Sequence, residues 1–170
     1  NEKGEQYRLR YDKNERLVEE IGFDGRVQQY EYNPIGHLVA HIEGAQSTTR
    51  FDRDPMGRLL QKHSPDGEQT VFQYNKNGRM VSAQNKHCTL AFEYTPNGQL
   101  KAEIQDQHKQ QHGYNLYGQR TATLLPSGTE IGYGYDSLGR FTALDFNGRN
   151  LVQLQHNERG QEIARQQGAL

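Results

Sequence analysis

Tyr133-Gly134-Tyr135-Asp136-Ser137-Leu138-Gly139-Arg140-Phe141 predicts a strand, a tight turn and the start of a returning strand. Tyr133 and Tyr135 lie two residues apart and therefore share one face of an extended chain. The Asp136 side chain can bond the backbone two residues on, and Gly139 can adopt the positive φ that closes such a turn. One β-hairpin is a common object, but here almost the same hairpin recurs eight times.

The repeat is visible when the turn glycine is taken as the anchor of each copy. The anchors follow one another at 21, 21, 20, 20, 21 and 21 residues, and they are Gly36, Gly57, Gly78, Gly98, Gly118, Gly139 and Gly160, with Glu15 in the same slot one period earlier. Four residues before the anchor stand Tyr11, Tyr32, Arg53, Tyr74, Tyr94, Tyr114, Tyr135 and His156. Six before it stand Leu9, Tyr30, Phe51, Phe72, Phe92, His112, Tyr133 and Leu154. A fixed period with aligned columns identifies a repeat architecture, so we expect residues 1–170 to form a single array of about eight repeats.

The composition alone would have suggested disorder, because only 32% of the residues are apolar and the mean hydropathy is −1.04. The periodic placement of the large apolar residues instead predicts an ordered sheet with a thin apolar layer. A net charge of −1 argues against a nucleic-acid surface, and no apolar run is long enough to span a membrane. The single cysteine, Cys88, excludes an intrachain disulfide framework.

Each period carries a second turn signal near its middle, such as Asp24-Gly25, Pro65-Asp66-Gly67 and Asn147-Gly148. Strand, turn, strand, turn in each copy gives about sixteen short strands. The fold class is therefore all-β, with tandem hairpins of ~21 residues forming an antiparallel sheet, and a sheet that wide should curl or spiral. Residues 99–111 and 151–167 also fit helical spacing, and the repeat register favours strands in both.

These motifs carry a resemblance. Four of them resemble the Y-D-x-x-G-R-L core of the YD (Rhs) repeat family, and the resemblance covers essentially the whole chain. They are Tyr11-Asp12, Tyr32-Asn33-x-x-Gly36, Tyr74-Asn75-x-x-Gly78-Arg79 and above all Tyr135-Asp136-Ser137-Leu138-Gly139-Arg140. The resemblance implies a hollow β-shell, which in bacterial members encloses a C-terminal toxin of the same polypeptide and in animal teneurins serves cell adhesion. It also implies a fragment of a larger protein. Asp54-Pro55-Met56-Gly57 superficially matches the start of the family's terminal D-P-x-G-L motif, but it sits inside the array and is interpreted as an ordinary turn rather than a cleavage site.

Residues that could carry chemistry are few. His37, His41 and Glu43 alternate along one segment and could in principle bind a metal, but we expect none, because a tetrahedral site needs more ligands. His87 and Cys88 are adjacent and would point to opposite faces of a strand, so they make a poor nucleophile pair. Asp106, His108 and His112 are expected to be solvated, and Gly132-Tyr133-Gly134 lacks the context of a phosphate loop. The arginines after the anchor should stack on neighbouring tyrosines or pair with acids across strands; these are Arg16, Arg58, Arg79 and Arg140.

The sequence thus predicts a structural protein, with no catalytic, cofactor or metal site, whose defining residues are the tyrosine and glycine columns. The resemblance implies a wall segment of a shell that encapsulates a polymorphic toxin. Its partners would be the rest of the shell, the cargo and a secretion-system spike or chaperone, and its route contact-dependent or type VI secretion out of a bacterial cell in interbacterial competition. The alternative is a cell-surface or carbohydrate-binding repeat module, although such modules typically use Trp, which this chain lacks. Unpaired terminal strands should make the isolated chain associate edge to edge.

Overall fold

The computed structural model describes residues 4, 6–44 and 47–168. It divides into two compact units, Asn1–Cys88 and Thr89–Leu170. All regular structure in the described residues is β-strand, and none of these residues forms a helix that could cross a membrane. The prediction of an all-β hairpin array is confirmed.

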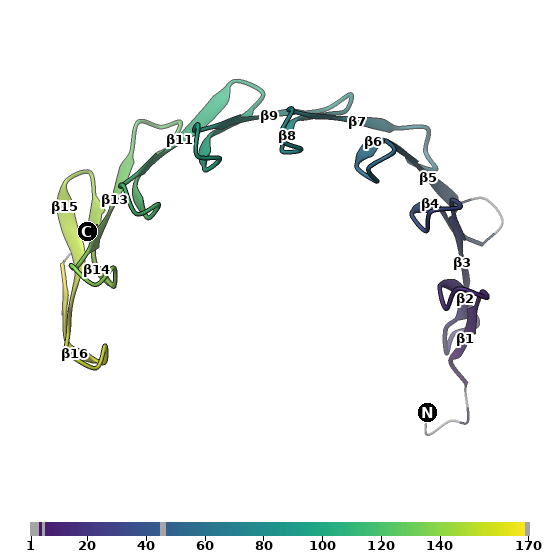
Figure 1. Ribbon diagram of the computed structural model, residues 1–170, viewed down its shortest axis with the longest axis horizontal. Coiled ribbons are helices and arrows are strands. Elements are labelled where there is room, and N and C mark those ends of the chain that lie inside the picture. The colour runs from purple at the N-terminus through teal and green to yellow at the C-terminus, as the bar shows by residue number, and fades with distance from the viewer. Residues whose placement is uncertain (1–3, 5, 45–46, 169–170) are drawn as a thin grey trace. The chain divides into compact units, whose positions relative to one another are not determined.

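Unit 1 contains eight strands, drawn from purple to teal in Figure 1. They are β1 (Arg8–Tyr11), β2 (Leu17–Ile21), β3 (Val27–Tyr32), β4 (Leu38–Glu43), β5 (Ser47–Arg53), β6 (Leu59–His63), β7 (Gln69–Tyr74) and β8 (Met80–Gln84). Each strand pairs antiparallel with the next in chain order.

Unit 2 repeats the same plan, drawn from green to yellow (Figure 1). Its strands are β9 (Thr89–Tyr94), β10 (Leu100–Gln105), β11 (His108–Tyr114), β12 (Arg120–Leu124), β13 (Glu130–Tyr135), β14 (Phe141–Phe146), β15 (Arg149–His156) and β16 (Glu162–Gln167). They too pair antiparallel in chain order. The two segments that also fitted helical spacing are strands and turns, as the repeat register predicted.

The register of every hairpin follows one rule. The residue four before the anchor lies opposite the residue two after it, for example Tyr32 opposite Leu38 and Tyr135 opposite Phe141. In the next pair away from the turn, the returning strand skips one residue, so that Glu31 lies opposite Ala40 and Gly134 opposite Ala143. This bulge recurs in all eight hairpins and increases the local twist of the sheet.

The apolar layer is thin, as the composition implied. Among the described residues, Ala40 and Ala102 are the hydrophobic side chains that are completely buried, and no large side chain is. Both alanines stand four residues after an anchor, opposite Glu31 and Glu93. Because directly opposite residues share a face, these alanines lie on the face away from the tyrosines.

Candidate functional site

The repeated turns are the most regular chemical feature of both units. In the seventh copy, Asp136 Oδ1 accepts the backbone N–H groups of Leu138 and Arg140 at 3.0 and 2.9 Å. Gly139 has a φ of 80° and donates its N–H to the Asp136 carbonyl at 2.9 Å. An acceptor three residues before the anchor therefore closes the turn, as expected for Asp and Asn. The same position is held by Asp12, Asn33, Asp54, Asn75, Thr95, Asn115 and Asn157.

The predicted glycine and tyrosine columns occupy constant places in this geometry. The anchor glycines all have positive φ, between 76° and 92°, and are Gly36, Gly57, Gly78, Gly98, Gly118, Gly139 and Gly160. Glu15, which replaces glycine in the first copy, has a φ of 62°. The tyrosines each end the strand that leads into a turn, and are Tyr11, Tyr32, Tyr74, Tyr94, Tyr114 and Tyr135. Asp54-Pro55-Met56-Gly57 forms the same turn as its neighbours, with Asp54 Oδ1 accepting from Met56 and Arg58.

An arginine after the anchor pairs with the acid of its own turn. The Nε–Oδ2 distances are 2.7 Å for Arg16–Asp12 and 2.6 Å for Arg140–Asp136. The Arg16 side-chain hydrogen bond holds the pKa of Asp12 below its usual value, and the backbone hydrogen bond from Arg140 does the same for Asp136. The sequence predicted an acidic partner across strands, whereas these partners are four residues back in the same turn.

The residue after the anchor also reaches the next repeat. Arg16 Nη1 donates to the Asn33 carbonyl at 3.3 Å and Arg140 Nη1 to the Asn157 carbonyl at 2.7 Å. Gln119 does the same with its amide, donating to the Gly139 carbonyl at 2.7 Å. Each of these bonds ties one turn to the turn of the following repeat.

The tyrosine column makes a second link between repeats. The hydroxyl donates to the backbone carbonyl two residues after the preceding anchor, at 2.8 to 2.9 Å, in the pairs Tyr32–Leu17, Tyr74–Leu59, Tyr114–Leu100 and Tyr135–Arg120. In unit 1 the preceding arginine lies over the ring, with 4.9 Å from Arg16 to the Tyr32 centroid and 5.2 Å from Arg58 to that of Tyr74. We call the hydroxyl–carbonyl bond and the bond from the residue after the anchor the inter-repeat latch.

The prediction that arginines after the anchor stack on neighbouring tyrosines is confirmed for Arg16 and Arg58, whose guanidinium groups lie over Tyr32 and Tyr74. One intervening strand separates the tyrosine strands of successive repeats, which places them about 9–10 Å apart. That spacing exceeds the ~4.5–7 Å at which rings pair. A guanidinium on a long side chain can fill the interval.

His37 and His41 do not form a metal site together. The His37 ring packs against the Cα of Gly57 in the next turn, whereas His41 stacks on Tyr30 at 4.9 Å between ring centroids. His41 Nε2 bonds Gln28 at 2.8 Å, and its distance to Glu43 is 3.7 Å. Within residues 4, 6–44 and 47–168, no group of three potential ligands is placed to hold a metal ion.

His112 corrects the expectation that it is solvated. It is only 7% exposed, its Nδ1 lies 3.2 Å from Thr123 Oγ1, and burial lowers its pKa. The reason is its position six before the anchor, a column otherwise held by apolar and aromatic side chains that are half-buried in the neighbouring repeats. His108 is exposed, and Asp106, also exposed, accepts the Thr89 N–H at 2.9 Å and so joins the turn after β10 to the start of β9.

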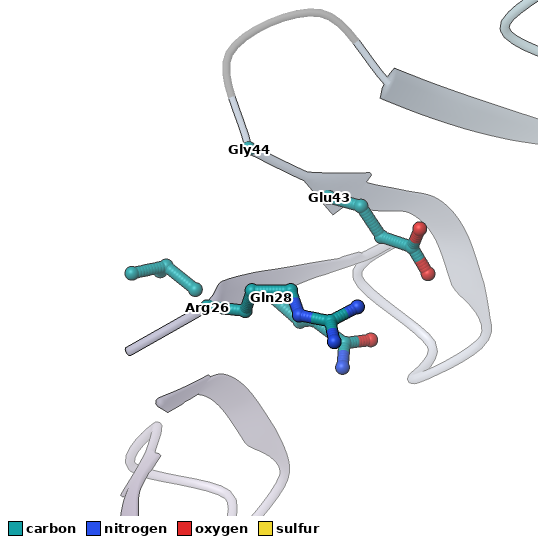
Figure 2. A pocket seen from close by; sticks show the side chains of 5 residues that line it. Arg26, Gln28, Glu43 and Gly44 are labelled. Carbon is teal, nitrogen blue, oxygen red and sulfur yellow. The ribbon is translucent and has the colours of Figure 1, made fainter. Parts of the chain in front are cut away.

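The remaining candidate residues of the described part of the chain lie apart from one another or in ordinary secondary structure. His87 is exposed and lies 3.8 Å from Glu68, while Cys88 is half-buried with its N–H bonded to Asn85. Gly132-Tyr133-Gly134 lies within strand β13 and forms no loop. A shallow pocket of about 340 Å³ lies at the turns that follow β2 and β4, where Figure 2 shows the polar heads of Arg26, Gln28 and Glu43.

Two features of the site were missed at the level of sequence. One is the bond from the residue after the anchor to the next turn, although the column itself (Arg16, His37, Arg58, Arg79, Gln99, Gln119, Arg140, Gln161) was readable. The other is the small-residue column four after the anchor, in which five of eight copies have alanine: Ala40, Ala102, Ala122, Ala143 and Ala164.

Comparison with known proteins places this geometry in a family. Residues 2–116 match the family described as Teneurin YD-shell. The chain is 26% identical over 194 aligned positions to double-stranded DNA deaminase toxin A of Burkholderia cenocepacia, covering 96% of the chain and 13% of that protein.

Two solved structures share the fold. The crystal structure of TcdB2-TccC3-Cdc42 superposes with a TM-score of 0.78 at 14% identity, over 92% of this chain and 10% of that one. The Photorhabdus luminescens Tc holotoxin pore, with the mutation TccC3-D651A, superposes with a TM-score of 0.71 at 13% identity, over 92% of this chain and 12% of that one. The chain thus spans about an eighth of the length of these relatives.

Proposed function

The chain belongs to the Teneurin YD-shell family, and from that premise we propose that it is a wall segment of a shell that encloses a toxin polypeptide. The observation that carries the proposal is the inter-repeat latch. Its hydroxyl–carbonyl bond recurs in both units with the same donor position and the same acceptor position. Such a sheet can be extended repeat by repeat without a thick core.

The action of the segment is steric. Backbone pairing between neighbouring strands leaves no gap along each unit, and the latches hold successive turns in register. One face of the sheet would meet the cargo and the other the outside. The chain itself performs no chemistry in this proposal, and it needs no cofactor or metal.

The names of the relatives support a toxin context. One relative is a deaminase toxin, and the structural neighbours contain TccC3 and a Tc holotoxin pore. We extend this to a C-terminal toxin carried by the same, longer polypeptide and released into a target cell. Delivery by type VI or contact-dependent secretion, with a spike or chaperone as partner, is the form that we propose for bacteria.

The test uses the full-length polypeptide that contains this chain. Limited proteolysis followed by low-resolution imaging should give a hollow, resistant particle with density inside, and denaturation should release a separate C-terminal piece. A solid particle, or an open sheet with no enclosed polypeptide, would overturn the proposal.

A latch variant makes the test specific to this segment. In the full-length polypeptide, Tyr32→Phe, Tyr74→Phe and Tyr135→Phe together should increase protease cleavage of the cargo, because each removes one hydroxyl–carbonyl bond between repeats. Tyr117→Phe is the matched control, since Tyr117 stands 90% exposed at the tip of a turn. Equal cleavage in both variants would show that the latch does not contribute to protecting the cargo.

Carbohydrate binding is the second candidate, and one observation favours it. Tyr117 borders an open pocket of about 590 Å³ that Gln119, Tyr135 and Asp136 also line. Four column tyrosines speak against it, because they are half-buried and their hydroxyls are bonded to backbone carbonyls: Tyr32, Tyr74, Tyr114 and Tyr135. Retention on a glycan array that Tyr117→Ala abolishes would support this function.

A further inference from the structure

A polar pocket lies on the hairpin formed by β3 and β4, which has a paired strand on either side. Its volume of about 340 Å³ is within the range of small-molecule sites. Gln28 and Glu43 lie directly opposite one another on the two strands, and Arg26 stands two residues before Gln28. Figure 2 shows the polar heads of these three side chains on one side of the ribbon, and Val27 completes the lining with apolar surface.

The charges at this pocket are not neutralised by one another. Arg26 uses its Nε to bond Asp24 Oδ2 at 2.5 Å, and among the described residues no acceptor meets its two terminal nitrogens. Glu43 has one basic neighbour in the same part of the chain, His41, whose Nε2 lies 3.7 Å from its Oε1 and so beyond hydrogen-bond distance. The edge of a guanidinium group and a carboxylate are therefore both available to a ligand.

The Gln28 amide is held in a fixed orientation. Its Oε1 accepts the Nε2–H of His41 at 2.8 Å, and the His41 ring is itself stacked on Tyr30. The Tyr30 hydroxyl lies 3.4 Å from the same oxygen and donates to Glu20 at 2.9 Å. Because the oxygen of the amide is engaged, its NH₂ group is the part that can donate to a ligand.

The repeat itself does not require these groups. Glu43 is the one acid among the eight residues that stand seven after an anchor, and Arg26 is the one arginine or lysine among those that stand ten before. The other residues seven after an anchor are Gly22, Ser64, Asn85, Gln105, Leu125, Phe146 and Gln167. The other hairpins form without this pair of charges, so the fold does not account for it.

We propose that this pocket binds a free α-amino acid, with the carboxylate of the ligand on Arg26 and Gln28 and its ammonium group on Glu43. The guanidinium edge and the amide NH₂ supply donors for the two carboxylate oxygens, and Glu43 accepts from the ammonium group. Val27, which is 38% exposed, contacts an aliphatic side chain of the ligand. An amino acid such as leucine matches the pocket in charge and in polarity.

Binding at this pocket does not depend on an enclosed toxin. It uses side chains of one hairpin, whereas the shell proposal rests on the latches between repeats. Failure of the cargo experiment therefore leaves the pocket proposal standing, and failure of amino acid binding leaves the shell proposal standing.

Saturation-transfer NMR with the full-length polypeptide that contains this chain tests the charge pattern of the ligand. The probes are leucine, 4-methylpentanoate, which lacks the ammonium group, and isopentylamine, which lacks the carboxylate. Leucine should bind with a Kd on the order of a few millimolar, and each of the other two probes should bind about tenfold more weakly. Absence of a saturable leucine signal, or equal affinity for the three probes, would overturn the proposal.

Two variants assign each half of the ligand to its residue. Glu43→Gln should weaken leucine binding about tenfold and leave 4-methylpentanoate binding unchanged, whereas Arg26→Gln should weaken leucine binding about tenfold and leave isopentylamine binding unchanged. Both side chains are exposed, so neither change should disturb the fold. Arg159→Gln, which changes an exposed arginine at the tip of a turn in unit 2, is the matched control and should bind leucine as the unmodified protein does. Leucine binding that survives both pocket variants would overturn the proposal.

Discussion

Arg53 Nε donates to the backbone carbonyl of Leu38 at 2.9 Å, the acceptor position that a tyrosine hydroxyl reaches in four other repeats. Arg53 Nη1 also donates to the Gly57 carbonyl at 2.9 Å, so one side chain spans its own turn and the preceding repeat. The bond to the carbonyl two residues after the preceding anchor therefore needs a hydrogen-bond donor four residues before the next anchor, and either tyrosine or arginine supplies it.

Substitutions of Arg53 test whether a hydrogen-bond donor at this position stabilises the repeat. Arg53→Ala removes both bonds and should lower the free energy of unfolding by about 2 kcal/mol, whereas Arg53→Tyr restores the bond to Leu38 and should recover about half of the loss. Urea denaturation followed by circular dichroism measures both. If the tyrosine variant is no more stable than the alanine variant, the column position does not act as a latch.

Gly57 allows conformational strain and close approach to be distinguished. Gly57→Ala places a methyl group at a φ of 84°, where its Cβ would overlap the imidazole of His37. Gly67 has nearly the same φ, 83°, and its Cβ would meet nothing within 4 Å. Gly67→Ala should therefore cost only the backbone term of about 1–2 kcal/mol, and Gly57→Ala should cost clearly more.

The excess cost should disappear when the overlapping ring is removed. In a His37→Ala background, Gly57→Ala and Gly67→Ala are expected to shift the urea midpoint equally. An excess that persists without the imidazole would mean that the Gly57 turn, rather than the packing of His37, is the source.

Much of this fold could be read from the sequence, because its information is local and periodic. Tyr135, Asp136 and Gly139 specify a strand end, a side-chain acceptor and a positive φ within five residues, and the period repeats that specification. The same register decided between strand and helix at residues 99–111, where Leu100 and Ile104 fitted either.

The latch could not be predicted from the sequence, because it joins residues 14 to 20 positions apart through the spacing of the sheet. Gln119 bonding the Gly139 carbonyl requires knowing how far apart the two turns lie. The burial of His112 was missed for a related reason. Its Gln-rich neighbourhood suggested solvation, whereas its place in the aromatic column decided its environment.

Asp136 has two roles that substitution can separate. Asp136→Asn keeps the Oδ1 acceptor for two backbone N–H groups and loses the ion pair with Arg140. Because four other turns are closed by asparagine, the variant should lose only a small part of the stability that Asp136→Ala loses. Hydrogen exchange at the Arg140 amide should stay slow in the asparagine variant and become fast in the alanine variant. Equal exchange in the two would mean that charge rather than the acceptor closes the turn.

His112 should make unit 2 sensitive to acid. Burial is the main cause that lowers its pKa below the ordinary 6.5, the Arg120 charge on β12 adds to this, and Glu103 on β10, 3.9 Å away, opposes it. The unfolded chain therefore binds the proton more readily than the folded chain, so this contribution to stability is complete above pH 6.5 and declines as the pH falls below it.

In His112→Phe the ring column stays filled and the titrating group is gone, so the difference in urea midpoint between the two proteins should be constant near pH 8 and shift in favour of the variant toward pH 5. His108→Gln, which changes an exposed histidine of the same strand, should follow the unmodified chain throughout. Parallel pH profiles for the unmodified chain and His112→Phe would show that protonation of His112 does not oppose folding.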